Sequence, residues 1–398
     1  MKGLNSPLNR KLRMALIGGA GNAFIGKVHA TAGTLDNRAE LVAGALSSSA
    51  SKSQAAAPSF GIPSDRAYAS PAELIENESQ RPADERIDFV SIATPNHTHF
   101  EIAKAALTAG FHVVCDKPMT IALDEAAELA RIVEATGAVF VLMHNYSGYP
   151  MIRQLREMIH NDELGDIIAV RANYIQGWLW GLSPGVVPPR GAWKADPQKA
   201  GPSGTLGDIG THAYQLVRYT TGLLPEEVSC NLKTYTPERA LDDYGHATIR
   251  FQTGALGLLT FSQVTHGRMN DQLLEIDGTK AAISWRQEDP NQLVVRQFGR
   301  PTQVYDRHPG ADFNNPSARA ASRLPGGHPE AFFEAFANLF RDGFDDMVTS
   351  SLGKPFKQRD TIYPNVYDGV EGMFFIQQCL ASHDQNGTWI SLRHSSAR

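Results

Sequence analysis

Short apolar runs alternate with helical patterns up to about residue 150, and this alternation constrains the fold more than any other feature of the chain. The runs are 12–17, 41–46, 87–93, 112–114 and 138–142, and helical patterns lie near 70–78, 99–109 and 123–136. Nearly continuous Val, Ile and Leu strands separated by helices are typical of a parallel sheet covered on both faces. The sequence therefore predicts a doubly wound α/β domain of the Rossmann type.

The first apolar run ends in a glycine-rich turn that leads into a helical pattern. Gly18-Gly19-Ala20-Gly21 is followed by Phe24-Ile25-Gly26. A strand, a glycine turn and a helix in this order suit the pyrophosphate of a dinucleotide, because glycine lets the backbone approach and the helix N-terminus supplies free amides. The spacing is unusual, since Phe24 stands where the third glycine is expected and Gly26 comes late. Taken alone, the turn also fits a plain strand–turn–helix.

Polar clusters follow two of the predicted strands. Thr94-Pro95-Asn96-His97-Thr98-His99 follows one strand, and Cys115-Asp116-Lys117-Pro118 follows the next. Open α/β sheets bind ligands at the carboxyl ends of their strands, so we expect both clusters to border the cofactor crevice. His97 and His99 could suggest a metal, but two histidines without a third ligand more often cap a polar loop. We therefore expect no metal.

The end of the second predicted strand bears on the choice of dinucleotide. Ser47-Ser48-Ser49 follows it, no acidic residue occurs before Asp65, and Lys52 is the nearby cation. An acidic residue at this place takes the adenosine ribose hydroxyls of NAD, whereas hydroxyls, amides and a lysine can accept a 2′-phosphate. The sequence predicts that NAD and NADP are both accepted, with a lean towards NADP.

The pattern changes after about residue 150. One helix over 151–159 leads into alternating segments, and helices near 328–342 and 364–383 follow. The alternating segments are 166–176, 227–235, 244–252, 255–265, 270–277, 280–285 and 291–298. Alternation with short turns predicts a large, mostly antiparallel open sheet. We expect domains over 1–148 and 149–398, with a partner copy covering the free sheet face in a homodimer or homotetramer.

The segment 204–212 carries the clearest candidate for acid–base chemistry. Asp208 precedes a helical pattern and is predicted to cap it, and His212 lies one helical turn further on. A carboxylate and an imidazole on one side of a helix form a natural acid–base pair, since the carboxylate orients the ring and raises its basicity. A capped helix with an incidental histidine is the alternative.

Tryptophans are concentrated in the loop region before this segment. Trp178, Trp180 and Trp193 occur there beside polar and cationic residues, which are Tyr174, Arg190 and Lys194. Aromatic faces next to polar tips suit a sugar ring, whose C–H faces stack and whose hydroxyls hydrogen-bond. A core or subunit contact is equally consistent with the composition.

Composition excludes several classes of function. A net charge of −5 over 398 residues offers no basic face for nucleic acid or an anionic membrane. No apolar run is long enough to span a bilayer, and the basic N-terminus lacks the apolar core of a signal peptide. Three separated cysteines form neither a disulfide framework nor a zinc cluster. We expect a cytoplasmic protein with reduced thiols.

Together, the glycine turn, 93–99, Asp116-Lys117-Pro118 and Gly207-Asp208-Ile209-Gly210-Thr211-His212 resemble the glucose–fructose oxidoreductase / inositol dehydrogenase / rhizopine catabolism family. The resemblance covers nearly the whole chain and implies NAD(P)-dependent oxidation of a secondary hydroxyl of a sugar, glycoside or cyclitol. Asp116 stands where the family usually has Glu, and Gln215 stands where many relatives have Asp.

The resemblance also implies roles for individual residues. Lys117, Asp208 and His212 match the catalytic residues of the family, and Tyr146 and His328 match regions that bind substrate. The same motifs occur in NAD-dependent glycosidases that oxidise their substrate transiently, so this activity stays open as an alternative. A non-catalytic sugar sensor is a further alternative, although such a protein would not need the lysine or the histidine.

Overall fold

The computed structural model describes residues 8–21, 23–179 and 192–393, and the chain forms two compact units. The first comprises Met1–Asn145 and Phe332–Val370, and the second comprises Tyr146–Ala331 and Glu371–Arg398. The sequence predicts a single domain boundary after residue 148, whereas in the structure residues 332–370 also belong to the first unit. Packing of one late helix on the first sheet is the reason.

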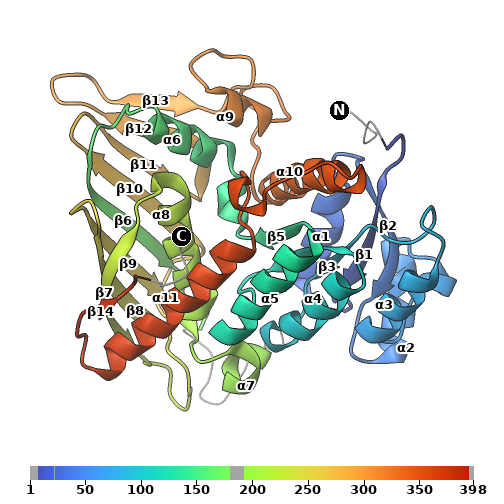
Figure 1. The fold of residues 1–398 in the computed structure, drawn as a ribbon. Helices are drawn as coiled ribbons and strands as arrows, with labels where there is room; N and C mark the ends of the chain where they lie inside the picture. Colours follow the sequence, from blue (N-terminus) through green and yellow to red (C-terminus); the bar gives the residue numbers. More distant parts are fainter. Residues whose placement is uncertain (1–7, 22, 180–191, 394–398) are drawn as a thin grey trace. The chain divides into compact units, whose positions relative to one another are not determined.

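The first unit is built on a parallel five-stranded sheet, as the alternation predicts. Its strand order is β2-β1-β3-β4-β5, and every neighbouring pair is parallel (Figure 1). The strands are β1 (Leu12–Ile17), β2 (Ala39–Ala45), β3 (Phe89–Ile92), β4 (His112–Asp116) and β5 (Phe140–Met143). The chain order reverses between β1 and β3, which is where sheets of this kind bind ligands, at the carboxyl ends of the strands.

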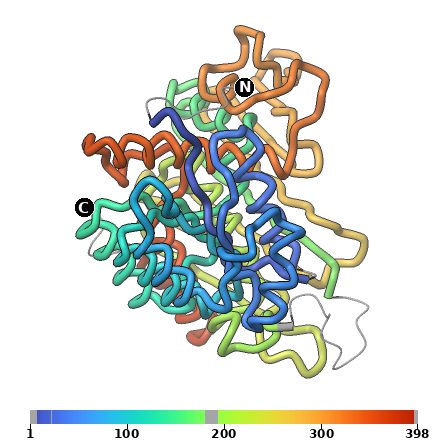
Figure 2. Tube along the Cα trace, turned by 90° about the vertical axis from the view of Figure 1, so that its right-hand side faces the viewer, coloured from blue at the N-terminus to red at the C-terminus, as the bar shows by residue number. Residues whose placement is uncertain are grey.

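Helices cover this sheet. They are α1 (Phe24–Thr34), α2 (Ala50–Ala56), α3 (Pro71–Gln80), α4 (His99–Thr108), α5 (Leu123–Thr136) and α10 (Phe332–Ser351). Helix α10 packs on α1, and the two lie side by side in Figures 1 and 2 although they are far apart in the sequence. Phe336, Phe340 and Phe344 of α10 are buried in one core with residues of β1, β3 and β5. Burial of each of these rings contributes about 1.5–3 kcal/mol, so α10 belongs to the first unit.

The second unit is built on a nine-stranded sheet of order β13-β12-β11-β10-β6-β9-β8-β7-β14. Only the β6–β9 pair is parallel, so the predicted, mostly antiparallel sheet is confirmed. The strands are β6 (Ile167–Ile175), β7 (Pro225–Lys233), β8 (Tyr244–Phe251), β9 (Leu256–Ser262), β10 (Asp271–Gly278), β11 (Ala282–Arg286), β12 (Asp289–Arg296), β13 (Gln303–Asp306) and β14 (Ile390–Ser391). Sequence periodicity did not reveal β13 or β14, because both are short edge strands.

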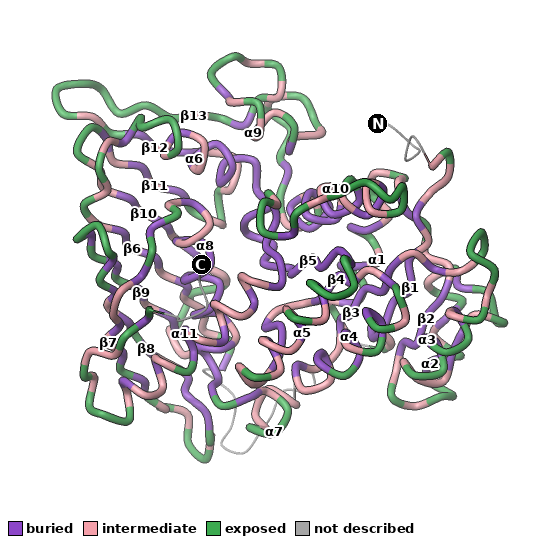
Figure 3. The backbone as a smooth tube through the Cα atoms, in the orientation of Figure 1, coloured by how far each residue is buried: buried purple, intermediate pink, exposed green. Residues whose placement is uncertain are grey.

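One face of this sheet packs against helices. Helices α6 (Pro150–His160) and α8 (Thr211–Thr221) contact its strands, and α11 (Val366–Asp384) is joined to β7 where the Ser382 hydroxyl accepts the Cys230 amide. Alternate residues along strands such as β8 and β9 are buried and exposed (Figure 3). Ile168, Leu256 and Leu258 are among the exposed apolar side chains. Coverage of these residues by a partner copy stays a prediction.

Across residues 8–21, 23–179 and 192–393, no helix combines the length and the hydropathy that crossing a membrane requires.

Candidate active site

The glycine turn after β1 has the geometry of a dinucleotide cradle. Gly18, Gly19 and Gly21 all have positive φ, at 97°, 106° and 64°, which disfavours residues with a Cβ. Gly26 of α1 supplies the close contact of the missing third glycine, because a Cβ there would lie 2.4 Å from Cα of Gly19. The late glycine therefore does not weaken the fingerprint. Helix α1 packs against the glycine turn at Gly26, not at Phe24.

His99 joins the ends of two neighbouring strands of the first unit. Its Nε2 lies 2.9 Å from the carbonyl oxygen of Thr94 after β3, and its Nδ1 lies 2.9 Å from that of Pro118 after β4. Burial lowers the pKa of His99, whereas the carbonyl oxygens of Pro118 and Thr94 act in the opposite direction, because each accepts a hydrogen bond from the ring. The side chain fixes the strand-end loops that carry Thr94, Pro95 and Lys117. We therefore assign His99 to positioning of the crevice.

The charge of Lys117 acts at this same edge of the first sheet. It follows β4, and the Lys117–Pro118 peptide bond is cis. Burial lowers the pKa of His144, just after β5, to about 3, and the positive charge of Lys117 adds to the effect. The lysine is therefore within electrostatic range of the ends of β4 and β5, where ligands bind in such sheets.

The predicted cofactor residues after β2 form an open, polar segment. Ser48 and Lys52 are exposed, and the Ser47 hydroxyl accepts the Ser49 amide at 3.2 Å. Ser53 is buried, where its hydroxyl accepts the Leu46 amide and donates to the Tyr68 carbonyl. Ser53 thus anchors the buried side of this serine segment, whereas Ser47 is half-buried and Ser48 is exposed.

Asp208 of the second unit does not cap a helix, contrary to the sequence prediction. It lies within a π-helical turn, Leu206–Gly210, that runs directly into α8 at Thr211, and no side-chain cap is present. Its Oδ2 instead accepts hydrogen bonds from Lys194 Nζ at 2.7 Å and Gln263 Nε2 at 2.8 Å. Turns of this type frequently occur at functional sites, because they place a side chain off the regular helical register.

The imidazole of His212 is enclosed by aromatic rings of the second unit. It is 6% exposed, and its ring centroid lies 4.9 Å from that of Tyr146 and 5.9 Å from that of Tyr174. The two tyrosine hydroxyls are 2.6 Å apart. His212 is thus held in a narrow aromatic environment with a carboxylate one turn earlier on the chain.

Asn270, which precedes β10, connects Tyr174 to Gln176, the residue that accepts a hydrogen bond from Trp178. Its Oδ1 accepts bonds from the Tyr174 hydroxyl at 2.8 Å and from Gln176 Nε2 at 2.7 Å. Trp178 Nε1 in turn donates to Gln176 Oε1 at 3.1 Å. Sequence reasoning missed Gln176, Gln263 and Asn270, because nothing in the local pattern marks the strand ends that bring these amides together.

Gln215, one turn after His212 on α8, is a further polar side chain of this region. It is 5% exposed, and neither its Oε1 nor its Nε2 has a hydrogen-bond partner among the described residues. A buried amide without a partner costs about 1–3 kcal/mol. A hydroxyl-bearing ligand would satisfy both atoms.

The remaining predicted substrate residues are placed differently. Trp180 and Arg190 lie outside the described residues. Trp193 contacts Lys194, whose Nζ lies 5.8 Å from the indole centroid. His328 is exposed, and its carbonyl accepts a bond from Arg307. The structure therefore brings Lys194 to Asp208, and the rings of Tyr146 and Tyr174 to His212.

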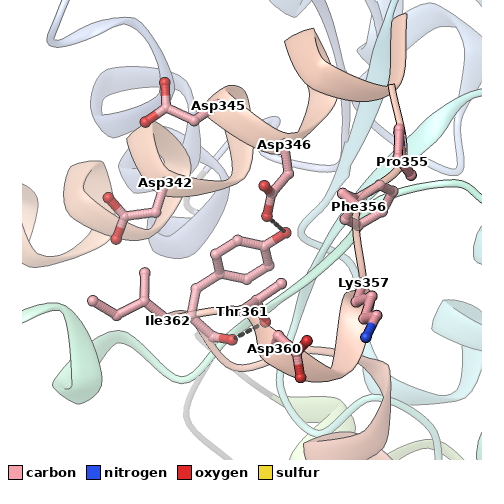
Figure 4. Close-up of a pocket in the computed structure, with 10 residues that line it drawn as sticks. Asp342, Asp345, Asp346, Pro355, Phe356, Lys357, Asp360, Thr361 and Ile362 are labelled. Carbon is pink, nitrogen blue, oxygen red and sulfur yellow. Dashed lines mark hydrogen bonds between the residues drawn. The ribbon is translucent and has the colours of Figure 1, made fainter. Parts of the chain in front are cut away.

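A pocket of the first unit contains none of the predicted site residues. Asp342, Asp345 and Asp346 of α10 line it together with the segment 355–363, and the Tyr363 hydroxyl donates to Asp346 at 2.7 Å (Figure 4). In the part of the chain that the structure describes, no three His, Cys, Asp or Glu side chains are arranged to hold a metal ion.

A glycine cradle on a parallel sheet is typical of dinucleotide-binding enzymes, and a carboxylate four residues before a buried imidazole suits acid–base chemistry. The model of the oxidoreductase family with an NAD-binding Rossmann fold matches residues 12–155, and the model of the GFO/IDH/MocA C-terminal domain matches residues 152–284. The chain belongs to the GFO/IDH/MocA family, and it is an NAD(P)-dependent dehydrogenase that acts on CH–OH groups.

Individual relatives agree with this assignment. The uncharacterized oxidoreductase YfiI of Bacillus subtilis is 30% identical over 97% of this chain and 98% of its own length. An inositol dehydrogenase homolog from Azotobacter vinelandii, complexed with NAD+, is 34% identical with a TM-score of 0.89, covering 96% of this chain and 97% of that one. Levoglucosan dehydrogenase of Pseudarthrobacter phenanthrenivorans is 32% identical over 53% of this chain and 58% of its own.

Proposed function

We propose that the protein oxidises a secondary hydroxyl of a sugar, glycoside or cyclitol, with His212 as the base that accepts the hydroxyl proton. The observation that carries this proposal is a buried imidazole, enclosed by two tyrosine rings, four residues after a carboxylate that a lysine and an amide hold in place. These groups can remove a proton at neutral pH and bind several hydroxyls of one ring.

Relatives support the substrate class. A structure of the Azotobacter vinelandii homolog, 34% identical with a TM-score of 0.88, contains NADH and myo-inositol. A levoglucosan dehydrogenase structure, 25% identical with a TM-score of 0.80, contains NADH and levoglucosan. Both ligands are rings with several hydroxyls. A buried amide such as Gln215 suits such a ring, because it can donate to one hydroxyl and accept from another.

The residues of the first unit fit the dinucleotide. Gly18, Gly19 and Gly21 provide close backbone approach for the pyrophosphate, and the N-terminus of α1 provides amides that attract its charge. Ser47, Ser48 and Lys52 would meet the adenosine ribose. The bound nicotinamide supplies the hydride acceptor of the reaction.

Lys117, His212 and Asp208 then have different roles in the reaction. Lys117 stabilises negative charge that develops on the substrate oxygen, since a fixed cation acts strongly where water is excluded. His212 takes the proton, and Asp208 orients the imidazole and stabilises its charged form. Tyr146 and Tyr174 hold the ring of His212 by edge and tilted contacts.

The test is a panel of sugars, glycosides and cyclitols, myo-inositol and levoglucosan included, assayed for reduction of NAD+ and NADP+. We expect stoichiometric NADH or NADPH with at least one polyhydroxylated ring. Chromatography of the same reactions detects the competing activity, because a glycosidase releases a free aglycone without net reduction. Release of aglycone alone, or no reduction with any member of the panel while the dinucleotide still binds, would overturn the proposal.

A further inference from the structure

We infer that Lys194 is a positioning residue that sets the charge of the Asp208–His212 pair and thereby the pH range in which His212 can act as a base. The inference rests on the proposed role of His212. It starts from the ion pair between Lys194 Nζ and Asp208 Oδ2, which measures 2.7 Å. The side chains of the pair are 32% and 20% exposed, so the interaction is partly shielded from water.

The carboxylate of Asp208 is fixed by more than this ion pair. Gln263 donates to the same Oδ2 at 2.8 Å, and Gln263 itself is 1% exposed. Its Oε1 accepts the Thr205 hydroxyl at 3.0 Å, which determines which end of the amide faces Asp208. One neutral and one charged donor therefore hold a single carboxylate oxygen, and of these two only the lysine brings a net charge.

A second lysine of the same segment shows what an ordinary surface pair looks like here. Lys199 pairs with Asp196 at 2.8 Å, but these side chains are 50% and 35% exposed, and Asp196 is the N-cap of the short helix Pro197–Ala200 that carries Lys199. Such a pair contributes little and is screened by salt. Lys194, by contrast, pairs with a residue 14 positions later in the chain, and its Nζ lies 5.8 Å from the centroid of the Trp193 ring.

Other titratable groups also face the pair. Tyr174 from β6 and Arg239 from the loop after β7 interact electrostatically with Asp208. The rings of Tyr146 and Tyr174 contact His212. Burial raises the pKa of Tyr174 well above its ordinary value, so this hydroxyl keeps its proton near pH 7. Lys194 donates a hydrogen bond to Asp208, and Arg239 adds a second positive charge within electrostatic range of it.

The sign of the effect follows from these charges. Asp208 and His212 both have Tyr174 as a neighbour, so the carboxylate favours the protonated imidazole, because opposite charges attract. Lys194 offsets that negative charge and so allows His212 to lose its proton at lower pH. Removal of Lys194 should therefore keep His212 protonated to higher pH, by about one pH unit for one charge at short range in a partly shielded site.

The experiment compares Lys194→Met, Lys194→Arg and Lys199→Met in the full chain. The first readout is the titration midpoint of the His212 ring by NMR with labelled histidine, assigned by loss of the signal in His212→Ala. The second is kcat/KM against pH with myo-inositol or the most active member of the panel. We expect Lys194→Met to raise the midpoint and the acid limb by about one pH unit, with about tenfold lower activity at pH 7 and near-normal activity at pH 9.

Lys194→Arg should restore both values, and Lys199→Met should match the wild type. An unchanged midpoint in Lys194→Met, or an equal shift in Lys199→Met, would overturn the inference. The NMR readout needs no substrate, so it separates this failure from a failure of the proposed function. If His212→Ala retains full activity while Lys194→Met still shifts the ring, the proposed base is wrong and the role of Lys194 in the charge of the pair stands.

Discussion

The imidazole of His212 packs at 80° against the ring of Tyr146, with centroids 4.9 Å apart. Tyr146 is stacked in turn on Tyr149, at 6.0 Å and 7°, and Tyr149 contacts Trp285 of β11 at 5.4 Å. Trp285 is 1% exposed. A continuous row of rings therefore connects the sheet to His212, and this row limits the orientations that the imidazole can adopt.

His212→Ala should slow the oxidation at pH 7 by about a hundredfold or more, the usual contribution of a general base. The loss should shrink at high pH, where the substrate hydroxyl ionises more easily without help. Rates measured from pH 6 to pH 10 test this. A pH-independent loss with collapsed substrate affinity would instead make His212 a binding residue.

Lys117→Ala should reduce turnover by at least about a hundredfold, the scale of removing one donor that stabilises developing charge. Dinucleotide affinity should stay within a few-fold, because the glycine turn is untouched. Lys104→Ala is the matched control, since Lys104 pairs with Glu128 on the surface of α4 and α5. Turnover within a few-fold of the wild type would contradict the assigned role.

Ser47→Asp should weaken NADP selectively, by about tenfold or more, because a carboxylate repels the 2′-phosphate and can bind the ribose hydroxyls of NAD. Ser59→Asp adds the same charge at another exposed serine of the same region and should change neither cofactor. The ratio of kcat/KM for the two dinucleotides is the measurement. A strong NAD preference in the unaltered protein would show that another residue reads the ribose.

Gln215→Met should raise KM about tenfold while leaving the protein as stable or more stable. Methionine fills a similar volume, and the change removes two buried polar atoms that lack partners in the described structure. Thermal unfolding and initial rates on the same preparations give both quantities. An unchanged KM would argue that Gln215 does not contact the substrate.

His29→Gln should make the free energy of unfolding fall less steeply as the pH is lowered from 6.5 towards 4. Burial lowers the pKa of His29 to about 4, below the unfolded value near 6.5, so the unfolded chain binds a proton that the folded one does not. The stabilising contribution is complete above pH 6.5 and is lost as pH falls towards 4, on the order of 3 kcal/mol in total. The difference between the melting temperatures at pH 7 and pH 5 should therefore be smaller in the variant than in the wild type. An equal difference would show that His29 does not cause the loss of stability in acid.

Hydrophobic periodicity and turn residues in the sequence predicted the glycine turn and both sheets, apart from the short edge strands β13 and β14, because longer strands and turns leave local signals. The environment of Asp208 could not be predicted in this way. Lys194, Asp208 and Gln263 meet only after a loop, a π-helical turn and a strand have been placed in three dimensions. The same holds for Asn270, whose role depends on which strand lies beside β6.

The placement of α10 bears on how the protein is made. The chain passes between its units at 145/146, 331/332 and 370/371, so neither unit is a continuous piece. A ribosome that has released the first 148 residues has delivered every strand of the parallel sheet, yet Phe336, Phe340 and Phe344 are still to be translated. The part of the first sheet's core that α10 completes therefore stays open until residues 332–351 have been synthesised, and exposed apolar surface of this kind is prone to aggregation in a nascent chain.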